Sequence, residues 1–540
     1  MSEGNLGIYE HNRKRVLART NPTSVSLMLD SAVLLSCAVC VVIGLFVALR
    51  WKSNTRCYPP GPPGFPIVGN LFNVPSEFSW CTFASWSRQY DSKIVHFEVL
   101  GQHVVVLNSH KAAQEIFERR SRNYSDRQRT VMIHELIGWH RNIAITPYGE
   151  AWRTRRRLFH QHFRQNAMPN YHAKLVKGGH ALLKLLLEAP DDFLKHIRFV
   201  SGATVLDIVY AVDVRPAGDE RMESVEQALY RFGLLADAGV YLVDIFPALK
   251  FLPSWLPGAG FKRDAAAWKV HVDCLFEASY LEVKADHVLG KSKPCLTSDL
   301  LEAFMDKSQD SEVEEHIISV TGTSFAGSDT TIFAMTVFFL VMLLYPDAQR
   351  KAQEELDRVV GRGRLPEIAD QEALPYISAI IKEVLRWQPI APTAVPHKSV
   401  ADDWYDGYFI PAGTVVIGNV WAILHDEERY PDPESFKPER FLTSEGALDP
   451  TVPDPLEVFG FGRRICPGRH FAQMSLFLYI AQVLAVFTIE RPVDERGRAV
   501  EPTRECVSGM FWYPKPFKAH IRPRFDGAEE LVRATCAATE

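Results

Sequence analysis

The sequence lacks a net positive charge, and it lacks the common motifs of DNA- and RNA-binding domains. Its 60 Lys and Arg residues and 65 Asp and Glu residues leave a formal net charge of −5 at pH 7. Nucleic-acid binding draws much of its affinity from a positive field that faces the phosphates. We therefore expect no nucleic-acid partner.

A disulfide framework is also lacking. The chain has 9 cysteines, an odd number, and they are scattered without regular spacing. This pattern is typical of a reducing compartment with mostly free thiols. Cys37 and Cys40 form a CxxC, but they lie in an uninterrupted apolar run, which favours buried small side chains over a metal or redox site.

Linkers, repeats and nucleotide-binding motifs are also missing, which limits the possible domain organisation. No long Gly/Ser- or Gln-rich linker follows residue 70, and no repeat of solenoid or propeller period occurs. Neither a GxGxxG after a predicted strand nor a P-loop is present, which indicates that the chain has no nicotinamide site of its own. The 540 residues, of which 47% are hydrophobic, predict one large catalytic domain.

An apolar run near the N-terminus is long enough to span a bilayer as a helix. Residues 31–49 carry no charge, and Arg50, Trp51 and Lys52 follow directly, unlike the cleavage site of a signal peptide. The prolines of the next segment fix φ and give a stiff, extended connection. We predict a polar segment at 1–24, a transmembrane anchor at 25–49, a basic and Pro/Gly-rich strap at 50–70, a catalytic domain at 71–525 and a C-terminal tail at 526–540.

The periodicity of the catalytic domain mixes strands and helices. Residues 93–107 have the pattern of strands, and long helical patterns fill the middle of the chain. The predicted class is therefore α+β, predominantly α, with small sheets.

The strongest candidate for chemistry is the stretch FGFGRRICPG at residues 459–468, which leads into a long apolar helical pattern. A helix N-terminus offers unpaired N–H groups and the positive end of the dipole, so we expect a lowered pKa for the Cys466 thiol. Gly462 and Gly468 allow the backbone to approach a flat cofactor closely. Phe459 is placed to cover the sulfur, and Arg464 is a candidate partner for a propionate.

These residues resemble the haem-binding signature FxxGxRxCxG of the cytochrome P-450 family, with every fixed position present. The resemblance implies the family's haem-domain fold and haem b, iron protoporphyrin IX, with Cys466 as the axial thiolate ligand. His470 lies four residues further on and is the alternative ligand, but the resemblance points to Cys466. A buried free cysteine would leave the other fixed positions unexplained.

A second motif, AGSDTT at residues 326–331, interrupts an apolar helical run. Ser311 and Glu314 have the spacing of a capping box for its start. Glycine inside a helix costs about 1 kcal/mol relative to alanine. The resemblance implies that this segment covers the distal haem face, where Thr330 steers protons to dioxygen and Asp329 relays them from solvent. The alternative is a threonine hydroxyl that simply bonds to a carbonyl one turn earlier.

A third motif pairs Glu383 with Arg386 at helical i, i+3 spacing. An exposed pair of this kind contributes only a few tenths of a kcal/mol. The resemblance instead implies a buried network with Arg440 that shapes the cysteine loop, and loss of one partner of such a network costs about 3–5 kcal/mol.

Basic residues elsewhere complete the site that the resemblance implies. Trp152 and Arg156 match the family's WRxxR element, and His397 matches a further propionate partner. Arg155 and Arg157 alternate with them and are candidates to face a redox partner. Taken alone, a charge run of this kind is most often a solvated face.

The chain resembles fungal microsomal members of secondary metabolism, the group related to O-methylsterigmatocystin oxidoreductase and tryptamine 4-monooxygenase. The implied reaction inserts one oxygen atom of O2 into a C–H bond, with NADPH-derived electrons from NADPH–cytochrome reductase and sometimes cytochrome b5. The implied pocket is largely apolar, which suits a terpenoid first and an aromatic, indole or polyketide scaffold next. Its candidate residues are Phe325, Ala326, Ala394, Val395, Met510 and Phe511.

Two other functions stay open. A haem-thiolate isomerase, dehydratase or peroxygenase would need no reductase, although the Asp329–Thr330 pair argues against it. A non-enzymatic membrane haem sensor would have no use for a proton relay. We expect a single-pass protein of the endoplasmic reticulum membrane with its haem domain in the cytosol, where the reductase and NADPH are found. The basic residues that flank the apolar run, four before it and three after it, do not by themselves decide this orientation.

Overall fold

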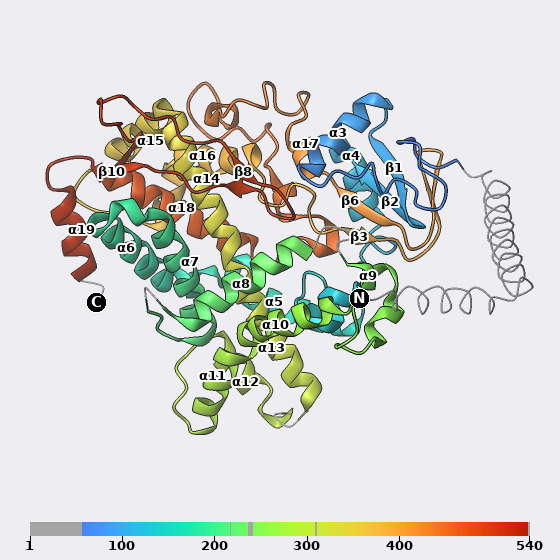
Figure 1. The fold of residues 1–540 in the computed structure, drawn as a ribbon. Helices are drawn as coiled ribbons and strands as arrows, with labels where there is room; N and C mark the ends of the chain where they lie inside the picture. Colours follow the sequence, from blue (N-terminus) through green and yellow to red (C-terminus); the bar gives the residue numbers. More distant parts are fainter. Residues whose placement is uncertain (1–56, 216–217, 236–240, 308–309, 538–540) are drawn as a thin grey trace, which may run out of the picture.

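The computed structural model describes residues 57–215, 218–235, 241–307 and 310–537, and it consists mainly of helices with a small sheet to one side (Figure 1). The predicted polar segment 1–24 and transmembrane anchor 25–49 lie outside the described residues. The predominance of helices is confirmed. The longer helices are α3 Ser79–Gln89, α5 Glu150–Phe163, α6 His172–Glu188, α7 Phe193–Tyr210, α8 Glu220–Leu235, α10 Gly260–Asp273, α11 Ser279–Val288, α12 Leu296–Ala303, α13 Ser311–Ala326, α14 Ser328–Leu344, α15 Pro346–Val359, α16 Pro375–Trp387, α18 Arg469–Val486 and α19 Ala528–Ala537.

Short strands form four small sheets. The four-stranded sheet has the order β1-β2-β6-β3, with β1 and β2 antiparallel and β2 and β6 parallel. The strand pattern of residues 93–107 is confirmed, since it forms the hairpin of β1 and β2. The strands are β1 Ile94–Val99, β2 Gln102–Leu107, β3 His397–Lys398, β4 Asp403–Tyr405, β5 Tyr408–Ile410, β6 Val415–Gly418, β7 Phe487–Glu490, β8 Cys506–Val507, β9 Tyr513–Pro514 and β10 His520–Pro523, and the short helices are α4 His110–Ala113, α9 Leu242–Ile245 and α17 Val420–Leu424.

The described part of the Pro-rich strap packs along β1, the edge strand of the larger sheet. The His96 N–H donates to the Pro60 carbonyl over 3.0 Å, and the Leu100 N–H donates to the Val68 carbonyl over 3.2 Å. A Cβ on Gly61 would lie 1.8 Å from the His96 carbonyl oxygen, so only glycine fits this approach. The strap is therefore part of the folded domain rather than a plain linker.

Helices α14 and α18 form the centre of the core. Both are apolar on nearly every face and almost completely buried, which is typical of a helix surrounded by others. Among the described residues, a helix long and apolar enough to cross a bilayer occurs only at Ser311–Leu344, and it is mostly buried inside the domain. The predicted capping box at its start is wrong. The Asp310 carboxylate caps α13 by accepting from the Glu312 N–H over 2.9 Å, and Ser311 is already the first helical residue.

The predicted C-terminal tail contains helix α19, which packs on α6 (Figure 1). Val532 and Cys536 are buried, and the Cys536 thiol donates to the His180 carbonyl over 3.3 Å. Burial of one apolar face stabilises this short helix against the domain.

Candidate functional site

The loop before α18 fixes the position of Cys466. Gly460 and Gly462 have φ values of 82° and 51°, in the left-handed region that favours glycine. A Cβ on Gly462 would lie 2.1 Å from the Phe117 carbonyl oxygen. The Cys466 N–H donates to the Phe459 carbonyl over 2.7 Å and closes the loop. These constraints place the thiol just before the first turn of α18.

The sequence predicts a lowered pKa for the Cys466 thiol, but the protein without a cofactor raises it. Burial raises the pKa of Cys466, and the Gly468 N–H together with the charges of Arg156 and Arg469 lowers it to a smaller extent. Desolvation of the charged form outweighs the effect of the helix N-terminus at this half-buried cysteine. A thiolate at this position requires further positive charge, which a bound metal ion supplies.

A buried cation, Arg464, lies close to the cysteine loop. Its Nε donates to the Ser125 carbonyl over 2.8 Å, and its guanidinium carbon lies 4.3 Å from the ring centroid of Trp152. Burial lowers the pKa of Arg464 to about 9. The Nη2 of Arg464 and the indole nitrogen of Trp152 are buried without a hydrogen-bond partner among the described residues. Two donors are thus left free to bind an acceptor.

Arg127 joins this cluster and was missed by the sequence analysis. Its Nη1 donates to the carbonyls of Val395 and Pro396 over 2.6 and 2.8 Å. Burial lowers the pKa of Arg127 far below its usual value, and the charge of Arg464 lowers it further. No motif surrounds Arg127 in the sequence, so only the fold reveals that it faces the cluster.

His397 lies on the same side of the site. Its Nδ1 is 2.6 Å from the Tyr124 carbonyl oxygen, and its ring packs at a tilt against Phe117, with centroids 4.2 Å apart. Burial and the charges of Arg127 and Arg464 hold the pKa of His397 well below its ordinary value. The neutral ring is a hydrogen-bonding group rather than a cation.

This arrangement fits a cofactor with a thiolate-bound metal and two carboxylates. Among the described residues, no carboxylate lies within ion-pair distance of Arg127, Arg156 or Arg464, although the charge of Asp126 acts on the pKa of Arg127 and of Arg464. Buried charges are strongly destabilising unless they are paired. An anionic ligand beside these side chains would remove that penalty, and the orphaned nitrogens of Arg464 and Trp152 supply donors for it. The residues present therefore fit a haem with its propionates.

The AGSDTT motif divides the central helical run into α13 and α14 at Gly327. The Thr330 hydroxyl donates to the Gly327 carbonyl over 2.9 Å, which is the bond that the simpler alternative foresaw. Asp329 is 7% exposed and lies 4.0 Å from Arg198, which is also 3.5 Å from Glu226. Burial raises the pKa of Asp329 to about 6, Arg198 opposes the rise, and Glu226 adds to it. A carboxyl group that titrates near neutral pH thus lies beside a hydroxyl group.

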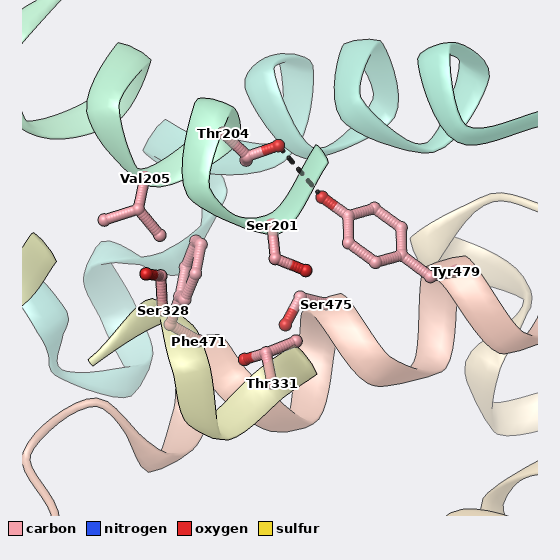
Figure 2. A pocket seen from close by; sticks show the side chains of 8 residues that line it. All are labelled: Ser201, Thr204, Val205, Ser328, Thr331, Phe471, Ser475 and Tyr479. Atoms are coloured by element: carbon pink, nitrogen blue, oxygen red, sulfur yellow. Dashed lines mark hydrogen bonds between the residues drawn. The ribbon is translucent and has the colours of Figure 1, made fainter. Parts of the chain in front are cut away.

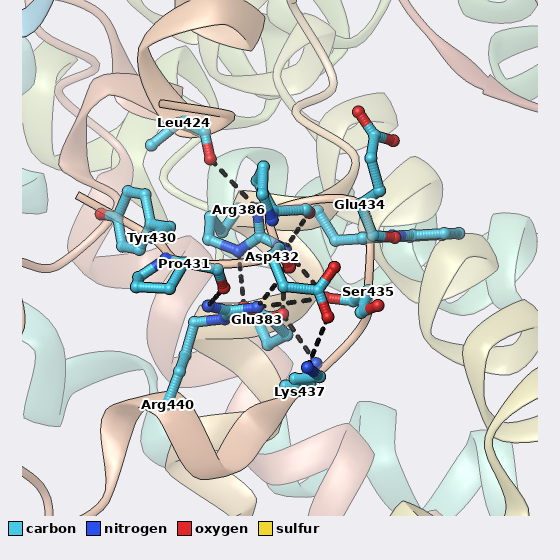
Figure 3. Close-up of polar contacts among 12 residues, drawn as sticks. Glu383, Arg386, Leu424, Tyr430, Pro431, Asp432, Glu434, Ser435, Lys437 and Arg440 are labelled. Carbon is cyan, nitrogen blue, oxygen red and sulfur yellow. Dashed lines mark hydrogen bonds and ion pairs between the residues drawn. The ribbon is translucent and has the colours of Figure 1, made fainter. Parts of the chain in front are cut away.

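Glu383, Arg386 and Arg440 form one buried network (Figure 3). Arg386 donates to both oxygens of Glu383 over 2.6 and 2.9 Å, and Arg440 donates to the same carboxylate over 3.0 Å. Their remaining donors reach backbone carbonyls, among them those of Leu424 and Pro431. The network joins α16 to the segment of residues 431–440 and satisfies every charge it buries.

Comparison with known proteins identifies the family. Residues 59–519 match the family model of Cytochrome P450. The chain belongs to the cytochrome P450 family. It is 40% identical over 92% of its length to Cytochrome P450 monooxygenase 98 of Postia placenta, covering 95% of that protein. It is also 40% identical over 88% of its length to Tryptamine 4-monooxygenase of Psilocybe cyanescens, covering 94% of that protein.

This P450 is therefore an enzyme, and its family uses haem, O2, reducing electrons, a redox partner and a small substrate. A third fungal relative, Cytochrome P450 monooxygenase ple1 of Rhodocybe pseudopiperita, is 41% identical over 89% of this chain and 92% of its own. The relatives and this P450 thus share nearly their whole length.

The basic helix α5 of this P450 does not present all its arginines to solvent. Arg155 is buried, donates to the His140 carbonyl over 3.3 Å and lies 3.8 Å from Glu315. Its predicted role at a redox-partner surface is therefore wrong, because it ties α5 to α13 instead. Arg157 is exposed, in agreement with a surface role. Burial lowers the pKa of Arg156, the charge of Cys466 opposes this, and the charge of Arg469 adds to it.

The predicted pocket residues of this P450 are divided between two core clusters. Phe325, Ala326, Val395, Met510 and Phe511 belong to or pack on the main core cluster. Phe511 also lies beside Phe333 of α14, with ring centroids 5.8 Å apart.

Ala394 belongs to a separate core cluster with Phe117 and Phe461, and it has a φ of 51°. His470, the alternative ligand, lies near Arg469 and His160, whose charges lower its pKa together with burial. Phe117 also lies against His397 and the backbone at Gly462, so Ala394 belongs to the same region as the cysteine loop.

Proposed function

We propose that this P450 is a haem-thiolate monooxygenase that inserts one oxygen atom of O2 into a C–H bond of a small hydrophobic secondary metabolite. The proposal rests chiefly on the position of the Cys466 thiol before α18 and on the buried guanidinium groups of Arg127 and Arg464, which form no ion pair with a described carboxylate. Haem b, ligated by Cys466, would supply dioxygen activation, with the thiolate favouring O–O cleavage.

The residues that would hold the haem come from four parts of the chain. Arg464 and Trp152 offer free donors to the propionates, and the newly found Arg127 adds a third group. His397 donates its Nδ1–H to the Tyr124 carbonyl, and its second ring nitrogen would donate to a propionate only if the negative charge of the propionate favoured the protonated ring. The loop residues Phe459, Gly462 and Gly468 shape the space around the sulfur. Arg156 places a positive charge near Cys466.

Asp329 and Thr330 would move protons. Because the pKa of Asp329 is about 6, its carboxyl group exchanges a proton readily near neutral pH. Arg198 and Glu226 lie on the side from which that proton would arrive. The Thr330 hydroxyl, bonded to the Gly327 carbonyl, keeps an oxygen that can accept a bond from a bound molecule.

The network of Glu383, Arg386 and Arg440 would be structural. It holds residues 431–440 against α16, and this segment leads toward the cysteine loop. We propose that it keeps the loop in shape for haem retention.

A terpenoid is the first substrate class that we propose, since Phe325, Met510 and Phe511 are apolar. An aromatic or indole scaffold is the second, supported by the printed name of the relative Tryptamine 4-monooxygenase. Type-I binding spectra with fungal terpenes, indoles and polyketides would distinguish these classes.

NADPH–cytochrome reductase, with cytochrome b5 as a further donor, is the redox partner that we propose. We also propose attachment to the endoplasmic reticulum membrane with a cytosolic haem domain. Exposed aromatic residues support contact with a bilayer, since Phe251 and Trp255 are 77% and 78% exposed.

The test combines two measurements on the purified protein. The reduced protein with carbon monoxide should give the red-shifted Soret band of thiolate ligation, and purified reductase with NADPH should yield a product labelled by ¹⁸O2. A product formed without reductase would favour the isomerase, dehydratase or peroxygenase alternative. A spectrum without any turnover would favour the haem sensor.

A further inference from the structure

A small cavity lies between α7, α14 and α18, on a side of α14 where no substrate or cofactor residue was predicted (Figure 2). It has room for about one water molecule. Six hydroxyl groups line it, and all six side chains are more than nine-tenths buried. They are Ser201 and Thr204 of α7, Ser328 and Thr331 of α14, and Ser475 and Tyr479 of α18.

The hydroxyls of Ser328 and Thr331 differ from the other buried hydroxyls of α13 and α14. Four of those bond to backbone carbonyls: Ser319 to Arg141, Thr321 to Ile317, Ser324 to Val320 and Thr336 to Ile332. Ser328 and Thr331 form no such bond with a described residue, and neither does Ser201 across the cavity. Buried hydroxyl groups normally have a partner, so these three require one that is not protein.

The cavity has a polar entrance. Thr204 and Tyr479 lie 3.2 Å apart at its edge, oxygen to oxygen. Thr204 also lines a larger, more open hollow between α6 and α7, beside Lys174 and Asp207. At Gly178 a Cβ would lie 2.4 Å from the Thr204 hydroxyl and 2.7 Å from the Tyr479 hydroxyl. The absence of a side chain at Gly178 therefore leaves room for this pair, which lies between the cavity and the outer hollow.

We propose that the cavity is a built water site, in which one water bridges Ser201 of α7 to Ser328 and Thr331 of α14. A buried water typically forms about three hydrogen bonds, which matches the three unpartnered hydroxyls. Ser328 precedes Asp329 and Thr331 follows Thr330. The bridging water would therefore hold in place the turn that carries the Asp329 carboxyl and the Thr330 hydroxyl. Arg198, one turn before Ser201 on α7, contacts Asp329 from the same helix.

Ser201, Ser328 and Thr331 are thus positioning residues, and their effect on coupling rests on the proposed monooxygenase function. Thr331→Val removes the hydroxyl at nearly constant volume. Thr336→Val is a matched control, because Thr336 is equally buried on the same helix but bonds to its own backbone. Thr331→Ser keeps the hydroxyl.

The first experiment measures peroxide and product per NADPH in the reconstituted holoenzymes at equal haem content. Thr331→Val should raise the peroxide-to-product ratio about fivefold, the change expected for loss of one ordinary hydrogen bond. Thr331→Ser and Thr336→Val should match the wild type. Equal ratios in Thr331→Val and Thr336→Val would overturn the proposal.

The second experiment does not depend on turnover. A high-resolution crystal structure of the wild-type holoenzyme should show one ordered water within hydrogen-bonding distance of the Ser201, Ser328 and Thr331 hydroxyls. Thr331→Val should lose it, and Thr336→Val should keep it. A dry cavity in the wild type would overturn the water site, whereas failure of the wild type to form product would overturn only the monooxygenase proposal.

Discussion

Arg198 of α7 and Asp329 of α14 lie 4.0 Å apart, nitrogen to oxygen, although they are far apart in the sequence. The carboxyl group is buried, and its pKa of about 6 reflects burial opposed by the Arg198 charge. The pair therefore sets the pH at which Asp329 takes up and releases its proton.

We predict that Arg198→Gln raises the pKa of Asp329 further, because a positive charge that favours the carboxylate is removed. The pH dependence of product per NADPH should shift to higher pH, and Arg198→Lys should stay close to the wild type. Product yields measured over a range of about four pH units that includes the expected pKa test this prediction. If the pH dependence of product per NADPH does not shift in Arg198→Gln, Arg198 has no influence on proton transfer by Asp329.

Cys466→His should abolish the red-shifted Soret band of the reduced carbon monoxide complex, because imidazole does not donate charge to iron as a thiolate does. Haem content is measured in parallel, so that loss of the band can be distinguished from loss of haem. Cys506→Ser is the control, since this free cysteine lies outside the site. Retention of the band in Cys466→His would show that another residue is the ligand.

Thr330→Ala should uncouple turnover, with peroxide rising as product falls, because the hydroxyl that would deliver the proton is lost. Loss of general acid catalysis lowers rates by about 100-fold or more, so the effect on product should be large. Thr330→Ser should restore coupling. Unchanged product per NADPH in Thr330→Ala would leave only the helix-stabilising bond to the Gly327 carbonyl as its role.

Glu383→Gln should lower the free energy of unfolding by about 3–5 kcal/mol, because it leaves Arg386 and Arg440 buried without a counter-charge. Asp432→Asn removes an exposed ion pair with Lys437 from the same segment and should cost less than about 1 kcal/mol. Denaturant unfolding of both variants, with haem release recorded, makes the comparison. Equal losses would contradict a buried, energetically coupled network.

Protease added to intact microsomes should digest the haem domain without detergent if this domain faces the cytosol. Asn123-Tyr124-Ser125 is an N-glycosylation sequon, and a lumenal domain could be modified there, but it is a poor reporter of topology in the folded domain. Its side chain donates to the Ala401 carbonyl over 3.1 Å and accepts from the N–H groups of Val400 and Ala401, and Ser125 is buried. If the protease digests the haem domain only after detergent is added, the domain lies in the lumen instead.

Local motifs allowed much of the site to be predicted. Each position of the cysteine loop and of the Glu383–Arg386 pair is set by neighbours a few residues away, so the sequence pattern contains the information. The helices that carry these residues follow from their apolar periodicity. The division at Gly327 follows from a glycine and polar residues inside an apolar run.

Features that depend on tertiary contact could not be predicted in this way. Arg127 and Arg464 come together from distant loops, and the burial that raises the pKa of Cys466 is a property of the whole fold. Arg155 belongs to a basic run but faces inward, because the packing of α5 on α13 decides its environment. The hydroxyl cavity likewise requires three helices to meet.

The strap along β1 has a consequence for handling the protein. An edge strand with free N–H and C=O groups is a template for pairing with another chain, and a segment that covers it blocks aggregation. The bonds of Pro60 and Val68 to His96 and Leu100 cover this edge. A truncation designed to make a soluble enzyme should therefore keep the chain from Cys57 onward. A chain that starts at residue 70 would leave the edge of β1 unpaired and prone to aggregation.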